Sequence, residues 1–151
     1  MITARSVAAA SCLILAPTAH ATLGGAYESV EADRAHMAAK AEAAPTIGFT
    51  TSTLTLANGG SVREFTRPDG VVFAITWHGP SRPDLRQLLG SYFDTLQSDN
   101  APRPGRRRMR APMTVNRSDF IVRTSGHSGA FSGVAYLPAL APADFSTSSL
   151  R

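Results

Sequence analysis

The sequence predicts one α+β domain, built from an N-terminal helix, an antiparallel three-stranded meander, a central amphipathic helix and a C-terminal β-hairpin. Two stretches carry this prediction. The turn residues Pro68-Asp69-Gly70 precede an apolar run, in which Val71, Phe73, Ile75 and Trp77 would share one face of a strand. Residues 85–96 then place large apolar side chains at helical spacing. We expect the domain to span residues 22–137.

The first 21 residues have the features of a secretory signal. Arg5 precedes a small apolar run at residues 7–15, and Ala19-His20-Ala21 has the small-x-small pattern of a cleavage site. The apolar run is shorter than the roughly 20 residues that cross a bilayer, so no transmembrane segment is expected. We therefore expect an exported protein, periplasmic or extracellular. Lipidation at Cys12 is the alternative, which conflicts with the position of Cys12 inside the apolar run.

The elements before the central helix follow from composition and turns. Residues 26–44 are rich in Ala and Glu between a glycine pair and a proline, which favours a helix. The Thr-rich residues 46–57 and the residues 61–66 flank a glycine-rich turn, so we expect two strands joined there. Together with residues 71–78 they form the predicted meander.

The central helix has a start signal and one apolar stripe. Ser81 is expected to cap it, with Pro83 and Asp84 in the first turn. The stripe consists of Leu85, Leu88, Leu89, Tyr92, Phe93 and Leu96. We expect this stripe to be buried against the sheet that holds Trp77.

The C-terminal part is predicted to contain a hairpin and a tail. Residues 120–124 and 131–137 favour strands on either side of Ser125-Gly126-His127-Ser128-Gly129. Residues 138–151 have two prolines and a Ser- and Thr-rich end without helical or strand periodicity, so a disordered tail is expected there.

Residues 99–112 combine prolines with a dense basic cluster and are predicted to form a loop. The cluster consists of Arg103, Arg106, Arg107, Arg108 and Arg110. Guanidinium groups at this density attract polyanions. Anionic lipid or acidic polysaccharide of the cell envelope suits an exported protein, whereas nucleic acid is not expected because the cluster lacks stacking aromatics. The alternative is a loop that only keeps the domain soluble.

Three segments together resemble a known family. Leu23-Gly24 behind an export signal, DGVVFAITWHGPSRPDLRQLLGSYF from Asp69 and SGHSGAFSGVAYLP from Ser125 are similar to the domain-of-unknown-function family numbered 2844, small exported proteins of proteobacteria. The resemblance spans nearly the whole mature chain. It implies an exported α+β domain without an assigned activity, and it supplies no catalytic residues.

No catalytic, cofactor or metal motif stands out in the sequence. His78 and His127 could form a metal or acid–base pair if the fold brought them together, but their spacing does not constrain this. The glycines around His127 fail the nucleophile-elbow pattern, because a strand rather than a helix follows them. We therefore expect a non-enzymatic accessory or binding protein without cofactor or bound metal. A small hydrolase or metal-dependent enzyme that uses His78 and His127 is the alternative.

Overall fold

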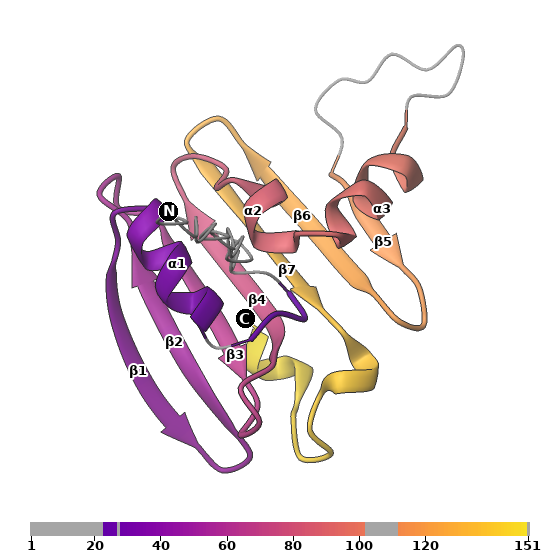
Figure 1. Ribbon diagram of the computed structural model, residues 1–151. Coiled ribbons are helices and arrows are strands. Elements are labelled where there is room, and N and C mark those ends of the chain that lie inside the picture. Colours follow the sequence, from indigo (N-terminus) through magenta and orange to yellow (C-terminus); the bar gives the residue numbers. More distant parts are fainter. Residues whose placement is uncertain (1–22, 27, 102–111, 151) are drawn as a thin grey trace, which may run out of the picture.

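The computed structural model describes residues 23–26, 28–101 and 112–150, and its main feature is one antiparallel sheet (Figure 1). The elements in chain order are α1 (Glu28–His36), β1 (Lys40–Thr46), β2 (Phe49–Thr55), β3 (Ser61–Thr66), β4 (Val72–Gly79), α2 (Leu85–Leu89), α3 (Tyr92–Asp99), β5 (Thr114–Asn116), β6 (Ile121–His127), β7 (Ala130–Tyr136) and the 3-10 helices η1 (Pro138–Leu140) and η2 (Thr147–Leu150). The seven strands lie in the order β1-β2-β3-β4-β7-β6-β5.

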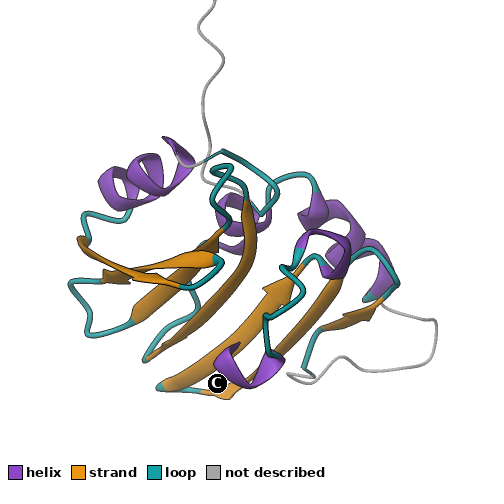
Figure 2. Ribbon diagram, turned by 90° about the horizontal axis from the view of Figure 1, so that it is seen from below, coloured by secondary structure: helices purple, strands orange, loops and turns teal. Residues whose placement is uncertain are grey.

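The sheet has two unlike faces. The helices α1, α2 and α3 lie on one side of it, and η2 lies on the other (Figure 2). We call the first side the helix face, which carries buried residues such as Leu54, Val62 and Ile75. We call the second side the open face, which carries the cross-strand pairs Arg63–Thr76 and Ser61–His78.

The predicted fold class is wrong. The structure is mainly a seven-stranded antiparallel sheet with short helices, not a three-stranded meander beside a separate hairpin and a central helix. The expected strands are present as β2, β3 and β4, but β7 pairs with β4 and joins the hairpin to the same sheet. Two further strands, β1 and β5, form the edges. Sequence periodicity is local and carries no information about which strands pair over long distances.

The N-terminal helix is shorter than predicted, since β1 occupies the second half of residues 26–44. The helix ends where Ala38 takes a left-handed conformation with φ of 47°. The amide of Ala39 then donates to the carbonyl of Arg34, and that of Ala38 to Ala35, a Schellman arrangement that usually contains glycine. No Gly or Pro stands at this position, so the sequence gives no warning of the break.

The predicted central helix is broken at Gly90, which has φ of 51° and separates α2 from α3. Its cap is Asp84 rather than Ser81, because the Asp84 carboxylate accepts from the amides of Arg86 and Gln87 at 2.9 and 3.2 Å. The apolar stripe is nevertheless buried: Leu85, Leu88, Leu89 and Leu96 are within the core, and Tyr92 and Phe93 pack against it. Burial of the stripe therefore does not require a continuous helix.

A β-bulge changes the faces predicted for β4. Phe65 pairs with Ala74 but Thr66 pairs with Val72, which leaves Phe73 as the extra residue. Phe73 consequently packs on the open face, whereas Ile75 and Trp77 stay in the helix-face core. The Trp77 ring covers Gly133, where an added Cβ would lie 2.2 Å from Cζ2 of Trp77.

The C-terminal segment, expected to be disordered, forms η1 and η2 and folds back over the open face. Its Phe145 ring lies 4.8 to 5.9 Å from the ring centroids of Phe49, Phe65 and Phe73. Each of these separations falls in the range of favourable aromatic pairs. One aromatic side chain thus packs the otherwise polar tail against the open face.

Candidate functional site

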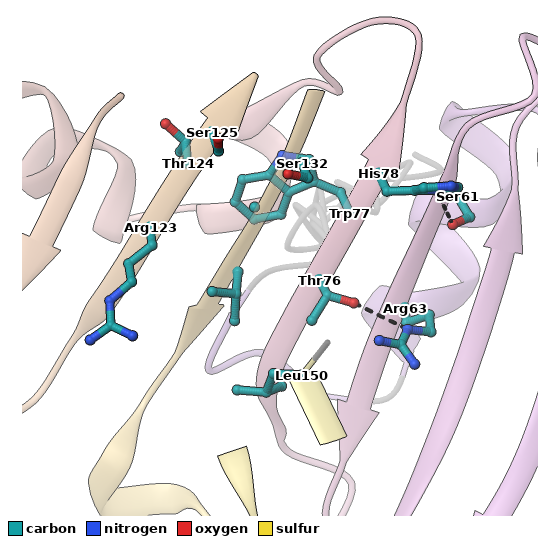
Figure 3. Close-up of a pocket in the computed structure, with 12 residues that line it drawn as sticks. Ser61, Arg63, Thr76, Trp77, His78, Arg123, Thr124, Ser125, Ser132 and Leu150 are labelled. Atoms are coloured by element: carbon teal, nitrogen blue, oxygen red, sulfur yellow. Dashed lines mark hydrogen bonds between the residues drawn. The ribbon is translucent and has the colours of Figure 1, made fainter. Parts of the chain in front are cut away.

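A cleft of about 550 Å³ lies on the open face, beside η2 of the tail and over strands β3, β4, β7 and β6 (Figure 3). Strands β3, β4, β7 and β6 supply its floor, and Leu150 of η2 closes one side. Its lining consists of Ser61, Arg63, Thr76, Trp77, His78, Arg123, Thr124, Ser125, Ser132, Gly133, Val134 and Leu150.

Strand register arranges the polar side chains of the cleft in two rows. Residues directly opposite each other in antiparallel strands share a face and lie close together. The hydroxyl row is Ser61, His78, Ser132 and Ser125, and the arginine row is Arg63, Thr76, Val134 and Arg123, each in the order β3, β4, β7 and β6. Both rows run across the strands, so four strands contribute to one polar surface.

Arg63 is held in place by neighbours on this face. Its Nε donates to Oγ1 of Thr76 at 3.2 Å, and its guanidinium lies 5.6 Å from the ring centroid of Phe65. A longer contact of 3.5 Å joins its Nη2 to the carbonyl oxygen of Ser149 in the tail. These contacts hold the Arg63 side chain on the open face.

Arg123 lies at the other end of the row and is exposed on β6. Three strand spacings separate it from Arg63, or about 14 Å between Cα atoms. Among the described residues, no Asp or Glu lines the cleft. No described acidic residue forms a salt bridge with Arg123. Glu42 of β1 is on this face but two strands beyond Arg63. The described lining of the cleft therefore has two arginines and no acidic side chain.

Ser61 and His78 form a hydrogen bond of 3.1 Å between Oγ and Nδ1. A serine nucleophile needs a histidine base that a third group orients. In the part of the chain that the structure describes, no carboxylate lines this cleft to do so. The pair is equipped to donate and accept hydrogen bonds at the cleft surface.

The structure does not bring His78 and His127 together. His127 is two strands away from His78 and two residues further along, which corresponds to about 12 Å between Cα atoms. Its Nδ1 contacts the carbonyl oxygen of Ser128 in its own turn, and it does not line the cleft. No group of three or more His, Cys, Asp or Glu residues able to hold a metal occurs among the described residues.

The five arginines of the predicted basic loop lie outside the described residues, which stop at residue 101 and resume at residue 112. On either side of this gap, Ala101 and Met113 line a second hollow of about 570 Å³ on the other side of the sheet. Arg82 and Arg86 also line this hollow. It adjoins the ends of the basic segment and is separate from the open-face cleft.

Sequence reasoning missed Arg63 and Arg123 as site residues. Each follows a buried valine, Val62 or Val122, at the outward position of a strand, so alternation could have placed both on the exposed side. Only the pairing of β4 with β7, which no sequence pattern indicated, puts them on one surface.

A buried pair of carboxyl groups lies on the helix face. Asp33 of α1 is 0% exposed and Glu64 of β3 is 1% exposed, and they share a hydrogen bond. Gln87 of α2 donates its amide to Oδ1 of Asp33. Burial, the hydrogen bond with Asp33 and the Asp33 charge raise the pKa of Glu64 to about 9. Glu64 is then protonated at neutral pH and links α1 to the sheet.

Comparisons with known proteins identify a family but no activity. No curated protein and no solved structure matches the chain. No helix among the described residues combines the length and apolar character of a membrane span. The resemblance predicted from the three sequence segments is confirmed, because the family described as "Protein of unknown function (DUF2844)" matches residues 19–150. Since this match covers most of the chain, the protein belongs to the DUF2844 family.

Proposed function

We propose that this chain is an exported, non-enzymatic binding protein that holds an anionic component of the cell envelope in the open-face cleft. One observation carries the proposal: the exposed Arg123 lies in the cleft beside the exposed hydroxyls of Ser125 and Ser132, and the described lining has no carboxylate. A cleft lined by one sign of charge concentrates ligands of the opposite sign. Arginine binds carboxylate, sulfate and phosphate groups through two parallel hydrogen bonds.

Binding without catalysis is the function that this geometry supports best. The Ser61–His78 pair has no carboxylate beside it in the described cleft, and His127 lies apart from it. A general base or nucleophile needs such partners within hydrogen-bond reach. Arg123 and the neighbouring serine hydroxyls, in contrast, can donate hydrogen bonds to an anion without further groups.

Export and the basic segment extend this proposal beyond the described residues. The signal pattern of residues 1–21 supports export, which would bring the cleft into contact with envelope lipid or polysaccharide. The cluster of Arg103, Arg106, Arg107, Arg108 and Arg110 would add a second, less selective attraction for the same polyanions. The cleft then supplies fixed contacts, and the cluster supplies charge.

The test is binding of the mature protein to an acidic polysaccharide and to anionic vesicles, at low and at physiological salt. Arg123→Ser should weaken binding, and affinity should fall with salt because the Debye length is only about 8 Å at physiological ionic strength. Arg86→Ser is the matched control, since Arg86 is an exposed arginine of α2 on the helix side. Equal affinity of wild type and Arg123→Ser would refute the role of the cleft.

A further inference from the structure

We propose that α1 is a releasable cover of the sheet, held in place by one proton that the buried side chains of Asp33 and Glu64 share. Loss of this proton releases α1 and uncovers apolar residues of the helix face, while the sheet stays folded. The cover lies on the helix face and is independent of the open-face cleft.

The attachment of α1 to the sheet depends largely on polar contacts. Its nine residues, ESVEADRAH, include one large apolar side chain, Val30, and this side chain is buried. Asp33 follows Val30 by three residues, so both lie on the same side of the helix, and Asp33 is buried as well. Apolar burial by α1 is therefore small, and the contacts of Asp33 decide whether the helix stays docked.

Asp33 connects α1 to two other elements. Its Oδ1 accepts a hydrogen bond from the side-chain amide of Gln87 in α2, and its carboxyl group shares a hydrogen bond with Glu64 in β3. Two carboxyl groups can share a hydrogen bond only if one of them carries a proton, because an ionised carboxylate is an acceptor alone. The link between α1 and β3 thus exists only while the pair holds a proton.

The neighbours of Glu64 on the sheet are uncharged. Ser52 of β2 and Ile75 of β4 lie directly opposite Glu64 in the strand register, and both are buried. Neither side chain can neutralise a second negative charge. Two like charges at hydrogen-bond distance in a buried site are strongly unfavourable, so the pair cannot ionise fully while α1 is docked.

The charged groups of the two helices are engaged at the surface. On α1, Glu31 and Arg34 form an ion pair with each other, and His36 is exposed at the end of the helix. On α2, Arg86 is exposed and its guanidinium lies 4.5 Å from the ring centroid of Phe93. The charge state of the buried pair is therefore set mainly by its own proton.

Proton loss is consequently coupled to the release of α1. In the docked form, burial, the hydrogen bond with Asp33 and the Asp33 charge raise the pKa of Glu64 to about 9 from its usual 4.5. Between these two values the released form gives up a proton that the docked form keeps. The ratio of released to docked protein therefore rises about tenfold per pH unit in this range.

Release of α1 uncovers apolar side chains of β2 and β3. Leu54 and Val62 lie opposite each other, are fully buried and belong to the same core cluster as Val30. Figure 1 shows α1 over this part of the sheet. The strand pairings do not involve α1, so the sheet can persist without it. The released form presents an apolar surface, and such surfaces commonly mark sites of protein–protein contact.

The experiment follows the position of α1 by pulsed electron paramagnetic resonance between pH 5 and pH 10. Spin labels are attached to Ala35→Cys of α1 and Ser98→Cys of α3, both at exposed positions, in the mature chain, which lacks Cys12. We expect one narrow distance at low pH, and a fraction of longer or broader distances that increases with pH by about tenfold per unit relative to the docked form. Labels at Ser98→Cys and Ser128→Cys, which do not report on α1, should keep one distance throughout.

Two neutral variants and one matched control test the role of the proton. Glu64→Gln and, separately, Asp33→Asn prevent the second charge and should keep α1 docked over the whole pH range. Glu31→Gln changes an exposed acidic residue of the same helix and should behave as the wild type does.

Three results would overturn the proposal. The first is a wild-type distance that is independent of pH, or that changes equally in both neutral variants. The second is a loss of the strand signal in circular dichroism at the same pH, because the whole domain would then unfold. The third is recovery of the docked distance at high pH on addition of calcium or magnesium, because a cation rather than a proton would then neutralise the pair.

Discussion

Arg63 and Glu64 are consecutive residues of β3, yet the sheet places them in opposite environments. Arg63 points to the open face, where it lines a cleft beside hydroxyl groups. Glu64 is buried on the helix face, where it shares a hydrogen bond with Asp33 beneath α1. The two faces thus divide the roles of the protein, because the helix face contains most of its core and the open face contains the candidate site.

This division means that stability and binding should respond to different substitutions. Changes on the helix face should affect the free energy of unfolding, while exposed changes in the cleft should affect affinity alone. The tail is an intermediate case, since it is packed on the open face but contacts both Arg63 and an aromatic cluster. Four predictions test this comparison, beginning with the largest expected effect.

Leu89→Ala should lower the free energy of unfolding by about 2 to 5 kcal/mol, since Leu89 is fully buried and the substitution leaves a cavity. Urea denaturation measures this loss. Ile47→Ala is the control on an exposed residue and should change stability by at most about 0.5 kcal/mol. A similar small effect of both substitutions would mean that the helix face does not hold the domain together.

The buried carboxyl pair predicts a stability that falls as pH rises. Glu64 has a folded-state pKa of about 9 against its usual 4.5, so the folded protein retains a proton that the unfolded chain releases between these values. This contribution is complete below pH 4.5 and is lost progressively as pH approaches 9. One proton changes stability by about 1.4 kcal/mol per pH unit, so the loss between pH 6 and 8 is about 2 to 3 kcal/mol.

Glu64→Gln should flatten this pH dependence, because the amide stays neutral and can still donate to Asp33. Denaturation midpoints at several pH values measure the slope. Glu31→Gln is the control, as Glu31 is exposed on α1, the helix that holds Asp33, and its Arg34 partner lowers its pKa. A wild-type slope that persists in Glu64→Gln would assign the titration to another group. Stabilisation by calcium or magnesium in the wild type would instead indicate that a cation, not a proton, neutralises the pair.

Phe145→Ala should lower stability by about 2 to 3 kcal/mol, less than a fully buried phenylalanine would, because Phe145 is only partly buried. The loss reflects contacts with Phe49, Phe65 and Phe73. Phe131→Ala provides the comparison, since that ring belongs to neither core and lies beside Arg82. If Phe145→Ala costs no more than Phe131→Ala, the tail is not anchored on the open face.

The sequence predicted local features well where a single side-chain pattern determines them. The stripe around Leu89 and the strand at β3 follow from periodicity, and the three family segments identified the family. The break at Ala38 was not predictable, because alanine adopts its left-handed conformation only under tertiary constraint. The Phe73 bulge was equally hidden, since an apolar run fits either face.

The candidate site depended on information that the sequence does not carry locally. Arg63 and Arg123 are sixty residues apart and meet on one surface because β7 pairs with β4. The charged sequence around Asp33 favours an exposed helix. Asp33 is nevertheless buried, because β3 and α2 pack against it. The arginine cluster at residues 103–110 is conspicuous by composition alone and stays a prediction, since it lies outside the described residues.

The smallest expected change in stability comes from two sets of arginines. Arg123→Ser should alter the free energy of unfolding by at most about 0.5 kcal/mol, since Arg123 is exposed. The triple replacement of Arg106, Arg107 and Arg108 by Ser should have an equally small effect, as expected from a segment whose composition predicts a loop. Thermal unfolding in parallel with binding to an acidic polysaccharide makes the measurement. If the cleft is the binding site, Arg123→Ser should lower affinity more than the triple variant does, whereas the triple variant should mainly reduce the salt dependence of binding. The reverse pattern would move the binding site from the open face to the basic segment, and a large loss of stability in Arg123→Ser would contradict the separation of the two faces.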